Sequence, residues 1–252
     1  MLCTSFNVVG FNWIASPTAT ELESIVIKCI PSSKRCPRSL ESSRPISTNS
    51  PHQLPLDLAM SPDVVHMAMK DDVASGMVPM YLCATCLWQK KNGVWLHVDA
   101  AYAGSTYIYP EFRHYLDRVE LADSISFNAH KWLLTNMDCC CLWIKSPSSP
   151  QNSLSNNAEF LSNNASETKG AVIDYKDWQI SLSRRFRAMK LWVVICRFGV
   201  ASLRDHVRSG IMMAEHFKGL VGVDPGLEVV VPRRFSLVCF RHKPKVKAMG
   251  MS

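Results

Sequence analysis

With 252 residues, of which 47% are hydrophobic, the chain is long enough to bury a sizeable core in one or two domains. Its formal net charge is +7, but the basic residues gather in a Ser/Pro-rich stretch near the start and around residues 184–190, and neither region carries a nucleic-acid-binding motif. No run of about 18 apolar residues is present. Composition and charge therefore argue against a nucleic-acid-binding or membrane-spanning protein.

Residues 1–30 begin without the basic start of a signal peptide, so none is expected. Apolar residues then recur at helical spacing and predict a helix. Thr20 and Glu23 have the spacing of a capping box at the start of that helix. Residues 31–59 are rich in serine, proline and arginine and have almost no apolar period, which predicts a linker or a disordered segment.

Helical spacing resumes at Pro62, a residue that suits the first position of a helix, and Gly76 marks the end of this helix. Residues 78–84 then predict a buried strand. The next strand starts near Trp95, and residues 86–93 between them are too few for the usual crossover of a parallel pair.

The central stretch reads as an α/β unit. Residues 94–98 predict a strand, residues 112–119 a helix and residues 124–127 a second strand. A strand, a crossover helix and a parallel strand need about this much chain, so both strands end at the same edge of the sheet. Asp99 and Lys131 follow those two ends, and open α/β sheets bind ligands at that edge.

One carboxylate and one lysine amine at such an edge suit pyridoxal phosphate. The lysine binds the cofactor covalently, and the carboxylate keeps the pyridinium nitrogen protonated because a nearby opposite charge favours the charged form. A lone Asp and Lys are more often a strand-end acid and a surface lysine, so this spacing by itself is weak evidence.

The ten cysteines contain one tight cluster, Cys139–Cys141. Adjacent residues of a strand point to opposite faces, so these three cannot share one tetrahedral metal. Cys83 and Cys86 form a CxxC pair that has no second pair at zinc spacing. We therefore expect reduced thiols and no metal site, which fits a cytoplasmic protein.

Several motifs carry more information than spacing. HVDAAYAGS at residues 97–105 and NAHKW at residues 128–132 closely resemble the group II pyridoxal-phosphate decarboxylases, in particular the plant aromatic amino acid decarboxylases and their aldehyde-synthase relatives. Residues 11–26 and 174–192 resemble the same family. The resemblance implies an α/β protein with the type I (aspartate aminotransferase-like) pyridoxal-phosphate-dependent transferase fold. It also implies a homodimer and an aromatic amino acid as substrate.

On this resemblance residues 60–188 form a large cofactor-binding domain, mainly of parallel sheet, and residues 189–252 the start of a small C-terminal α+β domain. Both are incomplete. Where relatives carry a glycine-rich phosphate loop and a histidine that stacks on the cofactor ring, this chain has only the segment 31–59. Its eleven glycines are scattered, so no phosphate cradle is visible, and we expect weak cofactor affinity.

The resemblance also assigns roles to individual residues around the cofactor, pyridoxal 5'-phosphate. Lys131 binds it covalently, Asp99 pairs with its ring nitrogen, and Ala101 packs against the ring face. His130 and Asn128 lie near its phosphate.

Two further residues concern the reaction and the substrate. Residues 146–172 correspond to a mobile catalytic lid, and Phe160 stands where decarboxylases carry tyrosine and aldehyde synthases phenylalanine. Ser183 matches a position where relatives with phenolic substrates tend to carry serine. Without the resemblance, Phe160 reads as the apolar anchor of a loop and Ser183 as a structural serine.

The C-terminal third is predicted from periodicity alone. Helical spacing predicts a long helical region from Trp178 to Cys196 and an amphipathic helix over residues 200–221. Residues 227–232 and 233–242 predict strands, the start of the small domain.

Three functions remain open. The first is oxidative decarboxylation and deamination of aromatic L-amino acids to phenylacetaldehyde-type aldehydes, which Phe160 favours. The second is simple decarboxylation to tyramine- or dopamine-type amines. The third is an inactive truncated homologue or a dimer partner, which the missing phosphate loop, stacking histidine and crossover favour.

Overall fold

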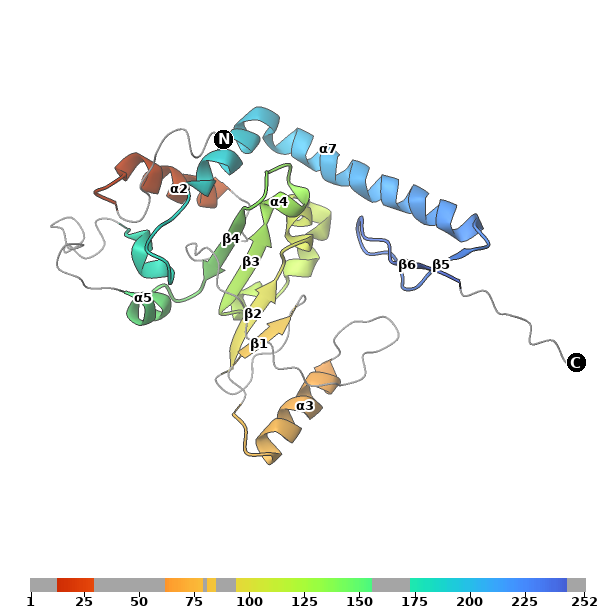
Figure 1. The fold of residues 1–252 in the computed structure, drawn as a ribbon, viewed down its shortest axis with the longest axis horizontal. Helices are drawn as coiled ribbons and strands as arrows, with labels where there is room; N and C mark the ends of the chain where they lie inside the picture. The colour runs from red at the N-terminus through yellow and green to blue at the C-terminus, as the bar shows by residue number, and fades with distance from the viewer. Residues whose placement is uncertain (1–12, 30–61, 79–80, 85–93, 156–172, 244–252) are drawn as a thin grey trace, which may run out of the picture.

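The computed structural model describes residues 13–29, 62–78, 81–84, 94–155 and 173–243. A four-stranded sheet with the strand order β1-β2-β3-β4 lies at its centre (Figure 1). The strands are β1 (Tyr81–Ala84), β2 (Trp95–Asp99), β3 (Ser124–Asn128) and β4 (Cys140–Ile144). The first three run parallel and β4 is antiparallel to β3. The predicted α/β class with a mainly parallel sheet is confirmed.

The connection between β1 and β2 is shorter than a parallel crossover usually needs, yet the two strands pair in parallel with Tyr81 opposite Trp95. β1 forms the edge of the described sheet, and Tyr81 is 37% exposed. The prediction of a buried strand is therefore wrong, because an apolar run does not distinguish an edge strand from a central one.

The segment between β2 and β3 differs from the predicted single α-helix. It forms three 3-10 helices, η1 (Ala103–Ile108), η2 (Pro110–Leu116) and η3 (Val119–Leu121). Arg118 has a left-handed backbone conformation with φ of 68°, which separates η2 from η3. The apolar spacing correctly marked helical turns, but it did not distinguish 3-10 from α geometry.

The main core covers one face of the sheet. Its sheet residues are Leu96, Val98, Ile125, Phe127, Cys141 and Trp143, and residues of η1, α2 and α7 pack on them. At Gly104 an added Cβ would lie 2.6 Å from Phe127 Cδ2, so only glycine lets η1 approach β3 this closely. A smaller cluster on the opposite face packs Tyr175 and Trp178 against Ile144.

The predicted N-terminal helix is present as α2 (Pro17–Cys29), but the capping box is not. The helix starts at Pro17, and the Thr20 hydroxyl donates to the Ser16 carbonyl one turn earlier. The prediction was wrong because proline at the first helical position moves the start of the helix ahead of Thr20.

Glu23 instead forms a buried ion pair with Arg184, a residue far away in the sequence. The Arg184 nitrogens Nη2 and Nη1 donate to Glu23 Oε1 and Oε2 at 2.7 and 3.0 Å. The side chains are only 4% and 11% exposed, and the guanidinium lies over the Tyr175 ring at 4.5 Å from its centroid. This pair fastens α2 to the segment that precedes α7.

We expect Glu23→Ala to lower the free energy of unfolding by about 3–5 kcal/mol, because it removes the carboxylate that compensates the buried Arg184 charge. Urea unfolding followed by circular dichroism measures the change. The matched control Glu21→Ala removes an exposed carboxylate from the same helix and should change stability by less than about 0.5 kcal/mol. Equal stabilities for the two variants would show that the buried pair contributes nothing.

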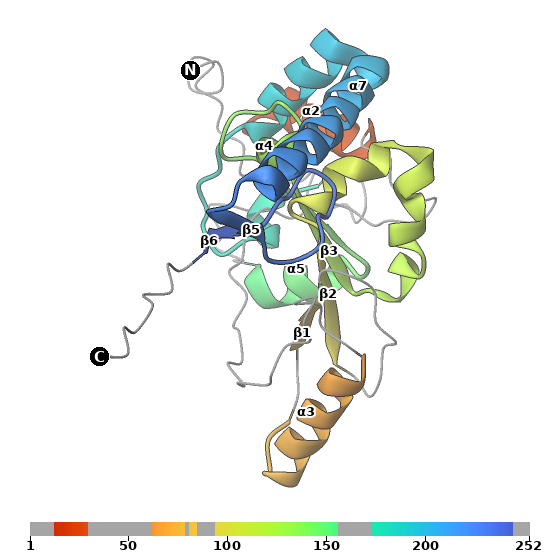
Figure 2. The ribbon, with the colours of Figure 1, turned by 90° about the vertical axis from the view of Figure 1, so that its right-hand side faces the viewer.

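The long helix α7 (Arg187–Val223) crosses one end of the sheet and reaches the C-terminal hairpin (Figures 1 and 2). It breaks at Gly199, where φ is 68°. The prediction of a helix from Trp178 onward is wrong, since η5 (Tyr175–Trp178) is a short 3-10 turn and non-helical backbone follows it up to α7. The predicted boundary between the two domains, after residue 188, falls in the first turn of α7.

The predicted C-terminal strands are present but shorter than predicted, as an antiparallel pair of β5 (Leu227–Val229) and β6 (Phe240–His242). The predicted helix is present as α3 (Pro62–Ala74), which extends away from the sheet (Figure 2) and is followed by a turn in which Gly76 has a φ of 78°. Within the predicted lid, α5 (Ser148–Leu154) is helical, and residues 156–172 lie outside the described residues. Across the described ranges, no helix combines the length and apolar character needed to span a membrane.

Candidate functional site

The carboxyl ends of β2 and β3 lie side by side, as their parallel pairing requires. Asp99 ends β2 in register with Ser126, and β3 ends at Asn128. Beyond the end of β2, the Ala100 N–H donates to the Ser126 carbonyl at 2.9 Å and the Asn128 N–H donates to the Ala101 carbonyl at 3.1 Å. The structure thus brings Asp99, Ala101 and Asn128 together at one edge of the sheet.

The Asp99 carboxylate is half-buried and is oriented by the turn that follows it. Its Oδ1 accepts the N–H of Ala101 at 2.9 Å, and its Oδ2 makes no hydrogen bond to any residue that the structure describes. Ala101 is itself 8% exposed. An anchored carboxylate with one free oxygen is suited to pairing with a protonated ring nitrogen.

His97 lies on the same face of β2 as Asp99 and is not among the site residues predicted from the sequence. Its Nδ1 lies 2.7 Å from the Ser124 hydroxyl and its Nε2 lies 3.1 Å from the Ser126 hydroxyl. Burial lowers the pKa of His97, and the negative charge of Asp99 acts in the opposite direction. The period of two along a strand was a signal for this neighbour.

Lys131 belongs to α4 (Ala129–Trp132), a single helical turn directly after β3. Trp132 anchors the turn, since it is buried and stacks on Tyr102 with 5.1 Å between ring centroids. Gly210 of α7 packs against it so closely that an added Cβ would lie 2.9 Å from the Trp132 Nε1. Lys131 is exposed, and its Nζ has no ion-pair or hydrogen-bond partner among the described residues. Its amine is therefore free to react with an aldehyde.

His130 precedes Lys131 and is held by the loop that leads to β4. The N–H of Cys139 donates to His130 Nδ1 at 2.9 Å. Asn128 and His130 both lie within three residues of Lys131 along the chain. Their predicted role near a phosphate stays a prediction.

The two residues that concern reaction and substrate are not joined to this edge. Phe160 lies outside the described residues. Ser183 is exposed in the segment before α7, and its carbonyl accepts a hydrogen bond from Gln179 Nε2 at 3.3 Å. No hydrogen bond between Ser183 and Asp99, Asn128 or Lys131 is present.

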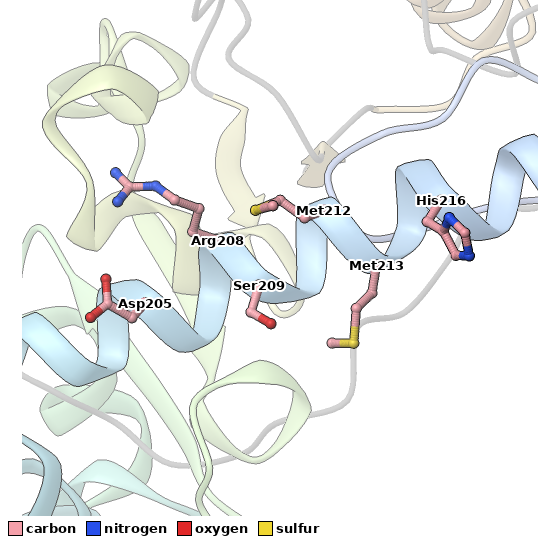
Figure 3. Close-up of a pocket in the computed structure, with 6 residues that line it drawn as sticks. All are labelled: Asp205, Arg208, Ser209, Met212, Met213 and His216. Carbon is pink, nitrogen blue, oxygen red and sulfur yellow. The ribbon is translucent and has the colours of Figure 1, made fainter.

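A hollow of about 420 Å³ lies on α7. It is lined by Asp205, Arg208, Ser209, Met212, Met213 and His216 (Figure 3). All six come from one helix, so the hollow is a surface groove, and it contains none of the predicted site residues. In the described part of the chain, no three or more His, Cys, Asp or Glu residues gather as metal ligands.

The residues at the sheet edge fit the ring of pyridoxal phosphate. A carboxylate such as that of Asp99 can pair with the ring nitrogen, and an amine such as that of Lys131 can bind the aldehyde carbon. Both assignments stay predictions. A glycine-rich cradle for the phosphate is not part of this edge. The described glycines with positive φ are Gly76 and Gly199, in the turn after α3 and at the break in α7.

Comparison with known proteins gives the same assignment. Residues 32–243 match the family described as "Pyridoxal-dependent decarboxylase conserved domain". The chain is 42% identical to phenylacetaldehyde synthase of a Rosa hybrid cultivar and 41% identical to tyrosine decarboxylase of Papaver somniferum. Each alignment covers 97% of this chain, and the chain spans about 63% of the length of these curated relatives.

The solved structure of Oryza sativa TDC with PLP and tryptamine superposes with a TM-score of 0.83 and 34% identity, covering 96% of this chain and 65% of that chain. The alignment to phenylacetaldehyde synthase runs over 319 residues, more than the 252 of this chain, so that relative carries internal segments that are missing here. The family match, the shared fold and the edge that carries Asp99 and Lys131 agree. The chain therefore belongs to the pyridoxal-dependent decarboxylase family, whose cofactor is pyridoxal phosphate.

Proposed function

We propose that this chain carries the site for decarboxylation of aromatic L-amino acids with pyridoxal phosphate. The observation that carries the proposal is the pair of Asp99 and Lys131, a half-buried carboxylate and a free amine at one edge of the sheet. The bound cofactor supplies an electron sink for the carbon that loses carbon dioxide.

The chain's own residues have separable tasks in this proposal. Lys131 holds the cofactor and exchanges protons with the reacting carbon. Asp99 keeps the ring nitrogen protonated because its negative charge favours the charged form. Because burial lowers the pKa of His97, the neighbouring imidazole carries no positive charge at neutral pH that would offset the negative charge of Asp99. Asn128 and His130 hold the phosphate.

The finer proposal concerns the product, and it rests on the identity of Phe160. After carbon dioxide leaves, the substrate carbon keeps an electron pair. A tyrosine hydroxyl at this position can protonate that carbon and give an amine, whereas phenylalanine has no proton to donate. Two electrons then pass to dioxygen. Amino acid, dioxygen and water yield aldehyde, carbon dioxide, ammonia and hydrogen peroxide.

The name of a relative and one expectation from the family resemblance support this choice. One of the relatives at 42% identity is named phenylacetaldehyde synthase, and two tyrosine decarboxylases of Petroselinum crispum are equally identical. Ser183 stands where relatives with phenolic substrates tend to carry serine, which favours phenylalanine, tyrosine or dihydroxyphenylalanine over tryptophan. We therefore propose phenylacetaldehyde-type products.

Phe160→Tyr is expected to divert the product from aldehyde and peroxide to the amine. General-acid help of this kind is worth about 10²–10⁴ in rate, enough to outcompete transfer of electrons to dioxygen. The measurement is simultaneous quantification of peroxide and amine with L-phenylalanine and excess cofactor. Phe198→Tyr, which adds the same hydroxyl to a partly exposed ring on α7, is the matched control and should leave the ratio unchanged. Amine without peroxide from the unmodified chain would contradict the finer proposal.

The second candidate is simple decarboxylation to amines, favoured by the 41% identity to tyrosine decarboxylase. The third is a non-catalytic homologue, favoured by the internal segments that the chain lacks relative to phenylacetaldehyde synthase. Release of carbon dioxide from carboxyl-labelled substrate separates the third from the other two. No release at saturating cofactor would establish a non-catalytic chain.

A further inference from the structure

An ion pair fastens the loop between α4 and β4 to the start of α7. Arg187, the first residue of α7, donates from Nη2 to Asp138 Oδ2 at 2.7 Å, and Arg185 Nη1 lies 3.9 Å from Oδ1. Arg187 is 21% exposed and Asp138 is 48% exposed. The hydrogen bond from Arg187 lowers the pKa of Asp138 to about 2, so the carboxylate is charged at neutral pH.

The next residue of this loop, Cys139, makes the contact with His130. Its N–H donates to His130 Nδ1 at 2.9 Å, and its carbonyl oxygen lies 3.0 Å from the same nitrogen. Cys139 is 2% exposed, so its backbone groups are shielded from water. A backbone N–H can only donate, so this contact requires a lone pair on Nδ1, which is the arrangement of the tautomer with its proton on Nε2.

The same geometry contains the alternative tautomer. If the Cys139 N–H moves away from Nδ1, the carbonyl oxygen becomes the better partner. Nδ1 then carries the proton and Nε2 is left with a lone pair. The two tautomers offer opposite chemistry at Nε2, a hydrogen-bond donor in one and an acceptor in the other. The position of Cys139 therefore decides what His130 presents beside Lys131.

We propose that Asp138 and Arg187 are positioning residues whose ion pair holds the Cys139 amide on His130 Nδ1, and so fixes His130 as an Nε2–H donor for an anionic group. The donor form attracts a phosphate oxygen, whereas the acceptor form repels it. The two residues act through His130. The identification of this anion as the cofactor phosphate rests on the proposed function. The prediction of the His130 tautomer is independent of that function.

The tautomer is measured directly by nitrogen-15 NMR of the histidine rings in the full chain. His130 is assigned by the disappearance of its signals in His130→Gln. We expect a protonated Nε2 and an unprotonated Nδ1 in the unmodified protein. Asp138→Asn and Arg187→Gln should both shift His130 towards the Nδ1–H form, and Arg187→Lys should restore part of the original state. Glu111→Gln breaks a more exposed ion pair, the one with Arg208, and should leave His130 unchanged.

Binding of pyridoxal phosphate compared with pyridoxal isolates the anion, because the two differ only in the phosphate. Asp138→Asn should weaken pyridoxal phosphate about two- to fivefold, the effect of losing one partly exposed ion pair, and leave pyridoxal unchanged. Thermal melting of each variant verifies that it is folded.

An Nδ1–H tautomer in the unmodified protein, or a tautomer that Asp138→Asn leaves unchanged, would overturn the positioning role. Equal weakening of both ligands would overturn the assignment of a phosphate. If neither ligand binds, the proposed function fails along with the phosphate assignment, and the NMR measurement still decides the positioning role.

Discussion

Lys131→Ala is expected to abolish covalent attachment of pyridoxal phosphate and to lower the decarboxylation rate by at least about 10²-fold. The substitution removes the free amine at the edge of the sheet that carries Asp99, and with it a proton-transfer group worth about 10²–10⁴ in rate. Trp132 still anchors α4, so the fold should persist. The measurements are the visible absorbance of the cofactor-loaded protein and carbon dioxide release from labelled substrate.

Lys145→Ala is the matched control. Lys145 is exposed just beyond β4, where Ser124 pairs with Ile144, at the end of the sheet opposite Asp99 and Lys131. Its loss removes one positive charge without touching the proposed site. If both variants keep the absorbance band and the activity of the unmodified chain, Lys131 is excluded as the attachment point.

Asp99→Asn should leave the cofactor bound but lower turnover by about 10²–10³-fold. This is the usual effect of removing one group that stabilises charge in the transition state. The amide preserves the shape and can still accept the Ala101 N–H. It carries no negative charge, so the ring nitrogen loses its proton more easily and withdraws fewer electrons. Steady-state kinetics at saturating cofactor measure the change.

Asp117→Asn is the control for the charge itself, since Asp117 is exposed at the end of η2, outside the site. It should leave turnover within error of the unmodified chain. Unchanged turnover in Asp99→Asn would contradict the role given to Asp99, whatever the control shows.

The centre of the fold could be predicted because its signals are local. A few consecutive residues are enough to predict each of the two strands, one of which ends at Asp99 and the other at Asn128. Their parallel pairing followed from the length of chain between them. Once both strands were placed, the meeting of Asp99 and Asn128 at one edge was a geometric consequence. Phosphate binding and the roles of Phe160 and Ser183 came from the resemblance alone and stay predictions.

The failures involve contacts between residues that are far apart in the sequence. Glu23 has the spacing of a capping residue, yet Arg184 binds it across the fold. The apolar spacing after Trp178 suggested a helix, but Trp178 packs with Tyr175 against Ile144, and α7 starts only at Arg187.

The immediate surroundings of His130 were equally hidden. Its tautomer depends on Cys139, and the position of Cys139 depends in our proposal on the pair between Asp138 and Arg187. No motif in the sequence marks Asp138 or Arg187, because neither lies in the strands that build the edge.

The most direct test of the assignment is to trap the cofactor on the full chain and find the lysine that holds it. The protein is incubated with excess pyridoxal phosphate, reduced with borohydride, digested and mapped by mass spectrometry. We predict one predominant phosphopyridoxyl label, on Lys131. Labels spread over exposed lysines such as Lys145 and Lys243, with Lys131 unmodified, would contradict a cofactor site at this edge of the sheet.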